Sequence, residues 1–147
     1  MASRIQHALD DIATLPDALL AHAQATRVEY LRHRDGAPTF SGTRLTDPDN
    51  LREGETSLAR LVAQGHTVEQ VTDAFEIITA YVVGFVIEEQ ERAQSAADRY
   101  DLAARDSVVG EDFPLAIASG HRTFRPAEEK FAEQLDLIVP ALADRSG

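Results

Sequence analysis

The run from Val68 to Gln94 constrains the fold more than any other part of the sequence. It follows Thr67, and the letters TVEQ at 67–70 fit the reciprocal capping box that opens a helix. Between Ala74 and Ile87 the chain reads AFEIITAYVVGFVI, which is apolar on nearly every face of a helix. Such a helix must be buried on several sides, so we expect the other elements to pack around it.

Helix signals cover most of the remaining chain. Thr14 is a candidate N-cap before Pro16, Gly36 and Gly65 can end helices, and Pro140 should kink or fray the last helix. The polar segment 95–112 shows no sustained period, and no stretch alternates as a strand does. The sequence therefore predicts an all-α fold with helices at about 3–12, 14–34, 48–63, 67–94, 113–121 and 126–143.

Composition excludes several classes of function. The chain has 147 residues, 25 acidic against 14 basic, and a formal net charge of -11, which opposes binding to nucleic acid. It has no cysteine and no signal peptide, and its most apolar run, Ile77–Ile87, is too short to span a bilayer. Five scattered histidines form no metal-binding spacing, and neither a nucleophile elbow nor a phosphate-binding glycine loop occurs. We expect a soluble cytoplasmic domain without metal or cofactor.

Glu76 is the one charge inside the apolar run of the long helix. An isolated carboxylate in a core costs several kcal/mol unless it is paired, hydrogen-bonded or protonated. One interpretation is that Glu76 faces solvent or pairs with an arginine such as Arg27 or Arg44. The other is that it lines a ligand cavity, whose wall would then consist of Thr72, Phe75, Glu76, Thr79 and Ala80.

The same helix ends in an acidic cluster, Glu88, Glu89 and Glu91. Carboxylates at a helix C-terminus oppose the helix dipole. A solvated acidic face explains them more simply than metal ligation, which would need further ligands at coordination distance.

Two stretches together resemble one known family. HRDGAPTFSGTR at 33–44 and, downstream, GHTVEQVTDAF with VVGFVIEEQE between 65 and 91 resemble the C-terminal domain of tetracycline-repressor (TetR) regulators. That family shows H-R-D-G-A, then G-T-R, a Gln-Gly stop and a long helix ending in Glu-Asp-Gln-Glu. The resemblance covers about Leu31–Gln94, and EQLDLIVPAL at 133–142 resembles the family's last dimerisation helix.

The resemblance implies an all-α domain that binds a small molecule in a tunnel and forms a homodimer. In the family a four-helix bundle joins the two subunits, and the matching helices here are roughly 113–122 and 126–143. A core within the single chain is the alternative explanation for the apolar positions of the last helix. The dimer interpretation places these residues at the interface: Phe131, Leu135, Ile138, Val139 and Leu142.

The resemblance also implies a pocket that differs from the tetracycline site. Phe40 stands where a histidine of the tetracycline-binding members ligates Mg²⁺, and a phenyl ring cannot coordinate a metal. His22 replaces an amide that grips the drug and Thr26 replaces an aromatic residue. We expect a ligand other than Mg–tetracycline, such as a polycyclic natural product. The predicted ligand-binding set is His22, Thr26, Phe40, Thr43, Arg44, Thr72, Phe75, Glu76, Thr79, Ala80 and Glu88.

The family's DNA-binding head has no counterpart in residues 1–147, which we interpret as a single ligand-binding and dimerisation domain. The favoured hypothesis is the effector domain of a TetR-type transcriptional regulator that does not itself bind DNA or membranes. The alternative is a head-less protein of a natural-product pathway. It would be an enzyme acting on a polycyclic or polyketide-like substrate, with Glu76 or His22 as general acid or base, or a sequestering binder. A pocket alone does not imply chemistry, so the regulator is preferred.

Overall fold

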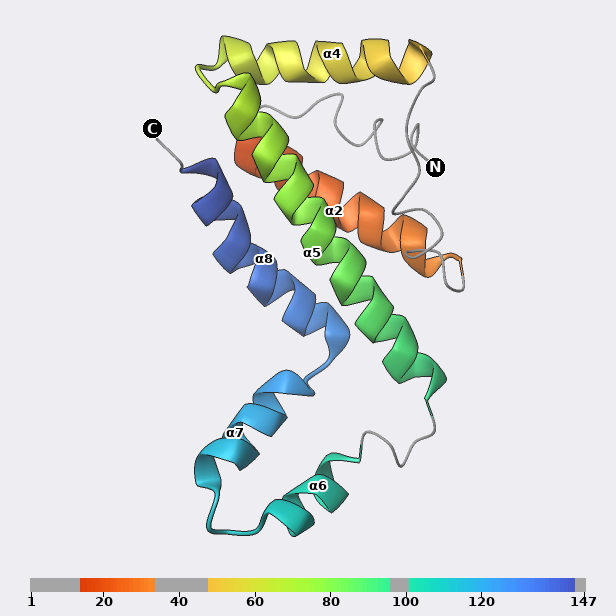
Figure 1. Ribbon diagram of the computed structural model, residues 1–147, viewed down its shortest axis with the longest axis vertical. Helices are drawn as coiled ribbons and strands as arrows, with labels where there is room; N and C mark the ends of the chain where they lie inside the picture. The colour runs from red at the N-terminus through yellow and green to blue at the C-terminus, as the bar shows by residue number, and fades with distance from the viewer. Residues whose placement is uncertain (1–13, 34–47, 96–100, 145–147) are drawn as a thin grey trace.

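The computed structural model describes residues 14–33, 48–95 and 101–144. Within these ranges the chain is helical and contains no strand, which confirms the predicted all-α fold. The elements in chain order are α2 (Leu15–Leu31), α4 (Pro48–Ala63), α5 (Val68–Gln94), α6 (Leu102–Val109), α7 (Pro114–Thr123) and α8 (Ala127–Ala143) (Figure 1). The helix predicted at 3–12 and the helix end at Gly36 lie outside the described residues.

Local signals set the ends of the two central helices as predicted. The Asp17 N–H donates to the Thr14 side chain at 3.3 Å, so Thr14 caps α2, and Pro16 lies in the first turn. At α5 both bonds of the capping box form, from Gln70 N to Thr67 Oγ1 at 3.1 Å and from Thr67 N to Gln70 Oε1 at 3.0 Å. Gly65, at φ 100°, takes the left-handed turn that separates α4 from α5. α2 ends three residues earlier than the predicted 34.

The sequence predicted no helix within 95–112. This prediction was wrong, since α6 forms there. The Asp101 carboxylate accepts from Ala103 N at 2.9 Å and Ala104 N at 3.1 Å, and Gly110 follows the helix at φ 72°. No residue of α6 is buried. The helix therefore has capping residues at both ends but lacks the periodic apolar residues that the prediction relied on. In α8 the helix continues three residues beyond Pro140, to Ala143, so this proline does not end it.

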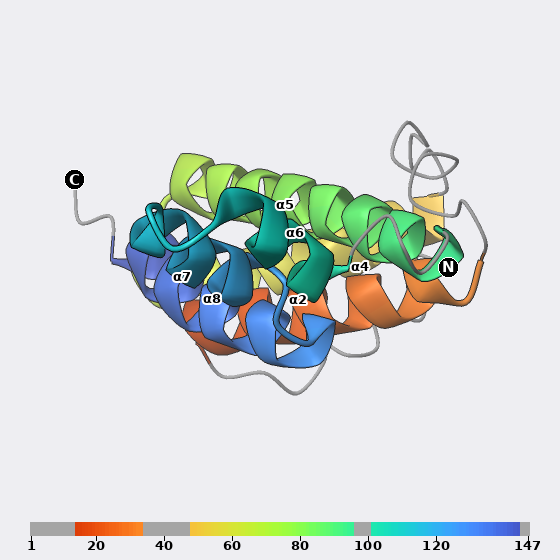
Figure 2. The same cartoon turned by 90° about the horizontal axis from the view of Figure 1, so that it is seen from below.

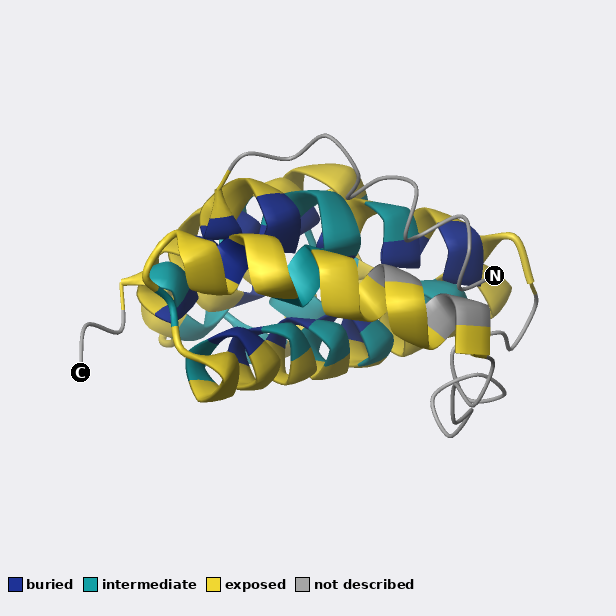
Figure 3. Ribbon diagram, turned by 90° about the horizontal axis from the view of Figure 1, so that it is seen from above, coloured by how far each residue is buried: buried dark blue, intermediate teal, exposed yellow. Residues whose placement is uncertain are grey.

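Three helices enclose the core. α5 crosses α2 and runs alongside α8, and it packs against both. α2 also packs on α8, and α4 lies across one end of α5 (Figures 1 and 2). Buried residues gather where the helices face one another, while the outer surface of α4 is exposed (Figure 3). The innermost apolar side chains are Leu15, Leu19, Ile78, Val82, Val86 and Leu135.

Arg27 joins the three core helices through charge. Its guanidinium donates to both oxygens of Glu89 on α5, at 2.9 and 2.8 Å, and to Glu128 on α8 at 2.6 Å. It also lies over the ring of Phe131 at 4.8 Å. These carboxylates raise the pKa of Arg27, so it is fully charged although only 9% of its side chain is exposed. Arg27, which the sequence left open as one possible partner of Glu76, is thus bound to Glu89 and Glu128 instead.

One face of α5 remains open. Ile77 and Ile87 are 45% and 40% exposed, and Ala80 and Gly84 between them are exposed as well. By length and composition this 27-residue helix could cross a membrane, since its most apolar window has a mean hydropathy of 1.4. The sequence prediction that no segment spans a bilayer considered only the central run of this helix. Core helices of soluble proteins also meet this criterion of length and hydropathy. Only 28% of that window is buried, which leaves apolar surface on the outside of the chain.

Candidate functional site

Three of the predicted ligand-binding residues meet between α2 and α5. His22 Nε2 lies 2.8 Å from Thr79 Oγ1, and the His22 and Phe75 rings meet edge to face with centroids 5.1 Å apart. All three side chains are half-buried. His22 is more than fifty residues before Phe75 and Thr79 in the sequence, and the packing of α2 on α5 brings it to them.

Hydrogen bonding fixes which imidazole nitrogen carries the proton. Thr79 has one hydroxyl hydrogen, and it donates this to the Phe75 carbonyl at 2.6 Å. The same oxygen must therefore accept from His22, which places the proton on Nε2. His22 Nδ1 is then left as an acceptor, with no hydrogen-bond partner among the described residues.

Burial keeps this imidazole neutral. It lowers the pKa of His22 from 6.5 to about 4, because the charged form would lose its hydration between the helices. At neutral pH His22 therefore offers one donor and one acceptor and no positive charge.

Thr26 adds a second unsatisfied polar group. It lies one helical turn after His22 on α2 and is only 2% exposed. Its hydroxyl oxygen has no hydrogen-bond partner in the described part of the chain. A buried hydroxyl without a partner costs about 1–3 kcal/mol, so a ligand group that bonds to it would recover this energy.

The rest of the predicted wall faces outward. Thr72, Glu76 and Ala80 are exposed on α5, as the solvent-facing interpretation of Glu76 requires. No contact joins Glu76 to His22 in the described residues, so the pair suggested for acid–base chemistry does not form a unit there. Phe40, Thr43 and Arg44 lie outside the described residues.

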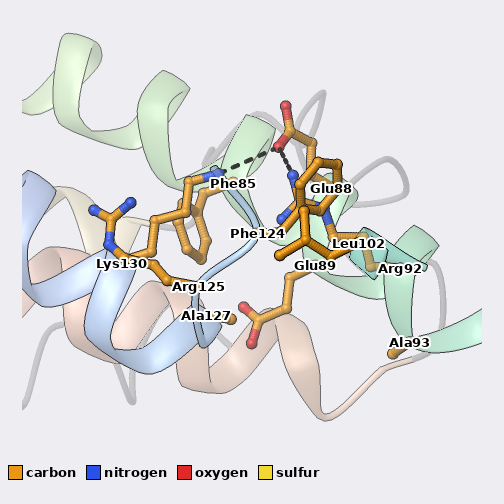
Figure 4. Close-up of a pocket in the computed structure, with 10 residues that line it drawn as sticks. All are labelled: Phe85, Glu88, Glu89, Arg92, Ala93, Leu102, Phe124, Arg125, Ala127 and Lys130. Atoms are coloured by element: carbon orange, nitrogen blue, oxygen red, sulfur yellow. Dashed lines mark ion pairs between the residues drawn. The ribbon is translucent and has the colours of Figure 1, made fainter. Parts of the chain in front are cut away.

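Glu88 lies apart from the His22 cluster. It is nine residues beyond Thr79 on α5, about 13 Å along the helix axis. Its carboxylate is 63% exposed and pairs with Arg92 at 3.5 Å and Lys130 at 3.8 Å. Glu88 thus lines a cavity to which His22, Phe75 and Thr79 do not contribute (Figure 4).

The predicted dimer face on α8 needs correction. Phe131, Leu135, Val139 and Leu142 are buried in the core of the single chain, at 3%, 1%, 7% and 9% exposure, and Ile138 packs against that core. They recur on one side of α8, the side that α2 and α5 cover. In this structure these side chains therefore form part of the single-chain core, which was the alternative explanation.

Sequence reasoning missed the charged residues that surround Glu88 and Glu89. Arg27 lies on α2, whereas Arg125 and Lys130 lie just before and at the start of α8. Arg27 binds Glu89, Lys130 lies 3.8 Å from Glu88, and Arg125 lines the same cavity. The only hint in the sequence was the acidic cluster itself, because half-buried carboxylates require cationic partners.

Fold and site together define an all-helical domain in which His22, Phe75 and Thr79 meet between a long central helix and its neighbour. Residues 10–145 match the family model described as "Tetracyclin repressor-like, C-terminal domain", so the chain belongs to this family of transcriptional-regulator domains.

A curated relative supports this assignment. The chain is 34% identical over 87 residues to the "Tetracycline repressor protein class G" of Vibrio anguillarum, a match that covers 58% of this chain and 41% of the relative. The chain thus spans less than half the length of that protein. No solved structure matches the chain.

Proposed function

We propose that this chain is the effector-binding and dimerisation domain of a TetR-type transcriptional regulator, and that its small-molecule effector binds at the His22 cluster. The observation that carries this proposal is a pair of acceptors on α2 that have no hydrogen-bond partner among the described residues, His22 Nδ1 and the Thr26 hydroxyl. Binding DNA is not assigned to these residues, because a net charge of -11 repels phosphates.

The cluster favours a flat ligand that carries O–H or N–H donors. Neutral His22 accepts one hydrogen bond at Nδ1, the Thr26 oxygen accepts another, and the Phe75 ring supplies an apolar surface. A metal–drug complex fits less well, because Phe40 occupies the position of the family's metal-ligating histidine. A hydroxylated polycyclic compound of the natural-product type satisfies these requirements.

Calorimetry with two probes tests the ligand class. We expect 1,8-dihydroxyanthraquinone to bind with or without Mg²⁺, and His22→Phe and Thr26→Val each to weaken binding about tenfold, the worth of one hydrogen bond. Leu51→Ala, on exposed α4, is the control that should not change it. Submicromolar, Mg²⁺-dependent binding of tetracycline, or anthraquinone binding that ignores both substitutions, would contradict the proposal.

The dimer proposal rests on the open face of α5. Ile77, Ala80, Gly84 and Ile87 form an exposed apolar stripe. The hydrogen bond from Tyr81 to Gln134 at 3.0 Å turns the Gln134 side of α8 toward α5. Leu137, three residues further on that flank, is 73% exposed. Two copies pairing through these two helices would bury the stripe in a four-helix arrangement.

Gly84→Ala tests the dimer proposal, because it should stabilise the monomer but weaken its association into a dimer. A Cβ at Gly84 meets nothing within 4 Å in the single chain, so Gly84→Ala should stabilise the monomer by about 0.5–1 kcal/mol through helix propensity. In a dimer with close helix approach the same methyl group should weaken association.

Sedimentation velocity over a concentration series measures the association. Ile77→Glu and Leu137→Glu should yield monomers, whereas Leu51→Glu, an equally exposed change on α4, should leave the dimer intact. A dimer that survives both charge substitutions on the stripe would rule out this interface.

A further inference from the structure

A cavity lies where the core meets the α6–α7 hairpin, away from the His22 cluster. It has a volume of about 360 Å³, at the lower end of the range for small-molecule pockets. α5, the start of α6, the α7–α8 junction and α8 all contribute to its lining (Figure 4). It therefore suits a ligand of roughly one aromatic ring with a polar group.

One cationic donor in its wall has no acceptor within hydrogen-bond range among the described residues. The Lys130 side chain is only 13% exposed, and its nearest carboxylate oxygen, on Glu88, is 3.8 Å away, beyond hydrogen-bond range. Arg125, which also lines the cavity, is already paired with Glu133 through its Nη2 at 2.9 Å. The Lys130 ammonium can therefore donate to a bound molecule.

The carboxylates of the lining do not meet this need. Both oxygens of Glu89 bind Arg27, so its charge is compensated from the α2 side. Glu88 is 63% exposed at the rim and is shared between Arg92 and Lys130 at long distances, 3.5 and 3.8 Å. Figure 4 shows the two carboxylates pointing in opposite directions, with the pairs of Glu88 dashed. An anion in the cavity can therefore replace Glu88 as the partner of Lys130.

The apolar part of the lining favours a planar molecule. Phe85 and Phe124 contribute aromatic surface, and Leu102 adds aliphatic surface. Lys130 Nζ lies 5.5 Å from the centre of the Phe85 ring, and the Arg92 guanidinium lies 5.0 Å from that of Phe124. These contacts place positive charge beside aromatic surface on both sides of the cavity.

We propose that this cavity binds a small planar carboxylate, with an oxygen accepting from Lys130 Nζ and its ring against Phe85 and Phe124. The site is independent of the effector site proposed above, because it shares no residue with the His22 cluster. The chain as a whole is strongly acidic, so binding of an anion here requires this local concentration of cations.

A fluorine NMR titration with 4-fluorobenzoate tests the proposal. Lys130→Gln should weaken binding about tenfold, through the loss of one charge-assisted hydrogen bond. Glu88→Gln should strengthen it about threefold, because a competing carboxylate is removed. Ala93→Phe, at an exposed position of the lining, should abolish binding by filling the space. Thr79→Val, in the other cluster, is the control that should leave the affinity unchanged.

Three results would contradict the proposal. Neutral 4-fluorobenzyl alcohol that binds as well as the acid would refute the role of the cations, and binding that survives Ala93→Phe would place the probe elsewhere. A lack of any binding at millimolar 4-fluorobenzoate would overturn the site itself. Glu88 and Ala93 are exposed, so the substitutions at these positions should leave the chain folded even if Lys130→Gln does not. Circular dichroism of each variant measures whether it is folded.

Discussion

The three-helix core and the α6–α7 hairpin are stabilised by different means. α2, α5 and α8 share a continuous set of buried apolar side chains, with Arg27 bound to Glu89 and Glu128 inside it. α6 buries no residue and α7 buries only Gly120. The hairpin instead exposes Val108, Phe113 and Leu115 at 88%, 60% and 84%. Its two helices pack chiefly on each other (Figure 2).

Polar contacts hold the hairpin together. Arg105 donates to the Ala116 carbonyl at 3.0 Å, and its guanidinium covers Gly120, where a Cβ would lie only 2.7 Å from Arg105 Cζ. His121 and Asp106 meet at 2.7 Å on the exposed side. A unit stabilised mainly by surface polar contacts should open more readily than one with a dense apolar core. The difference predicts that substitutions act globally in the core and locally in the hairpin.

The largest effect is expected from Arg27→Ala. It leaves Glu89 with its charge uncompensated in a half-buried position, and breaking such a pair costs about 3–5 kcal/mol. Chemical denaturation should show this loss. Arg122→Ala is the matched control: the Arg122 side chain is 61% exposed, its pair with Glu133 lies on the surface, and its removal should cost less than about 1 kcal/mol. Equal losses for the two variants would show that the core is not cross-linked by Arg27.

Leu135→Ala comes next. Leu135 is 1% exposed in the core, and truncation of a buried leucine costs about 2–5 kcal/mol, depending on how far the cavity closes. Leu115→Ala, the same change at 84% exposure in the hairpin, should lie within about 0.5 kcal/mol of zero. The two unfolding midpoints are the measurement. A large loss at Leu115 would mean that the hairpin is covered in solution.

The same contrast explains what the sequence could predict. Caps at Thr14, Thr67 and Gly65, and the apolar period of α5, are local signals that depend on neighbouring residues alone, so they predicted these helix ends correctly. The hairpin was predicted only in part. α6 has a good N-cap in Asp101 but no apolar face, and a period-based reading cannot detect such a helix.

Contacts between helices were less accessible to prediction. Arg27 is 62 residues from Glu89 and 101 from Glu128, and no local pattern specifies which carboxylate a buried arginine will meet. The resemblance to the TetR family predicted His22, Phe75 and Thr79 as parts of one pocket, and the structure brings these three side chains together. It did not distinguish the side of α8 that packs within the chain from the side left open, because both sides carry apolar residues.

A pH effect should follow from His22. Its pKa is about 4 in the folded chain and 6.5 when unfolded, so between these values the unfolded chain binds more protons. Stability should therefore fall as the pH drops below 6.5, by about 2 kcal/mol at pH 5 relative to pH 7.5. His22→Gln should remove this part of the pH dependence, as measured by urea denaturation at both values. Parallel pH profiles for the two chains would show that His22 is hydrated in the native state.

The smallest predicted effect separates the two regions most directly. Arg105→Ala removes the hydrogen bond to the Ala116 carbonyl, which should lower the opening free energy of the hairpin by about 1 kcal/mol. Native-state hydrogen exchange should then be several-fold faster at α6 and α7 amides and unchanged at α5 and α8 amides, since the hairpin opens without the core. Thr56→Ala, which removes a side-chain bond to the Arg52 carbonyl within α4, is a control that should not affect the hairpin. If hydrogen exchange of α5 amides accelerated equally after Arg105→Ala, the hairpin and the core would unfold as one cooperative unit. The two regions would then differ only in their composition.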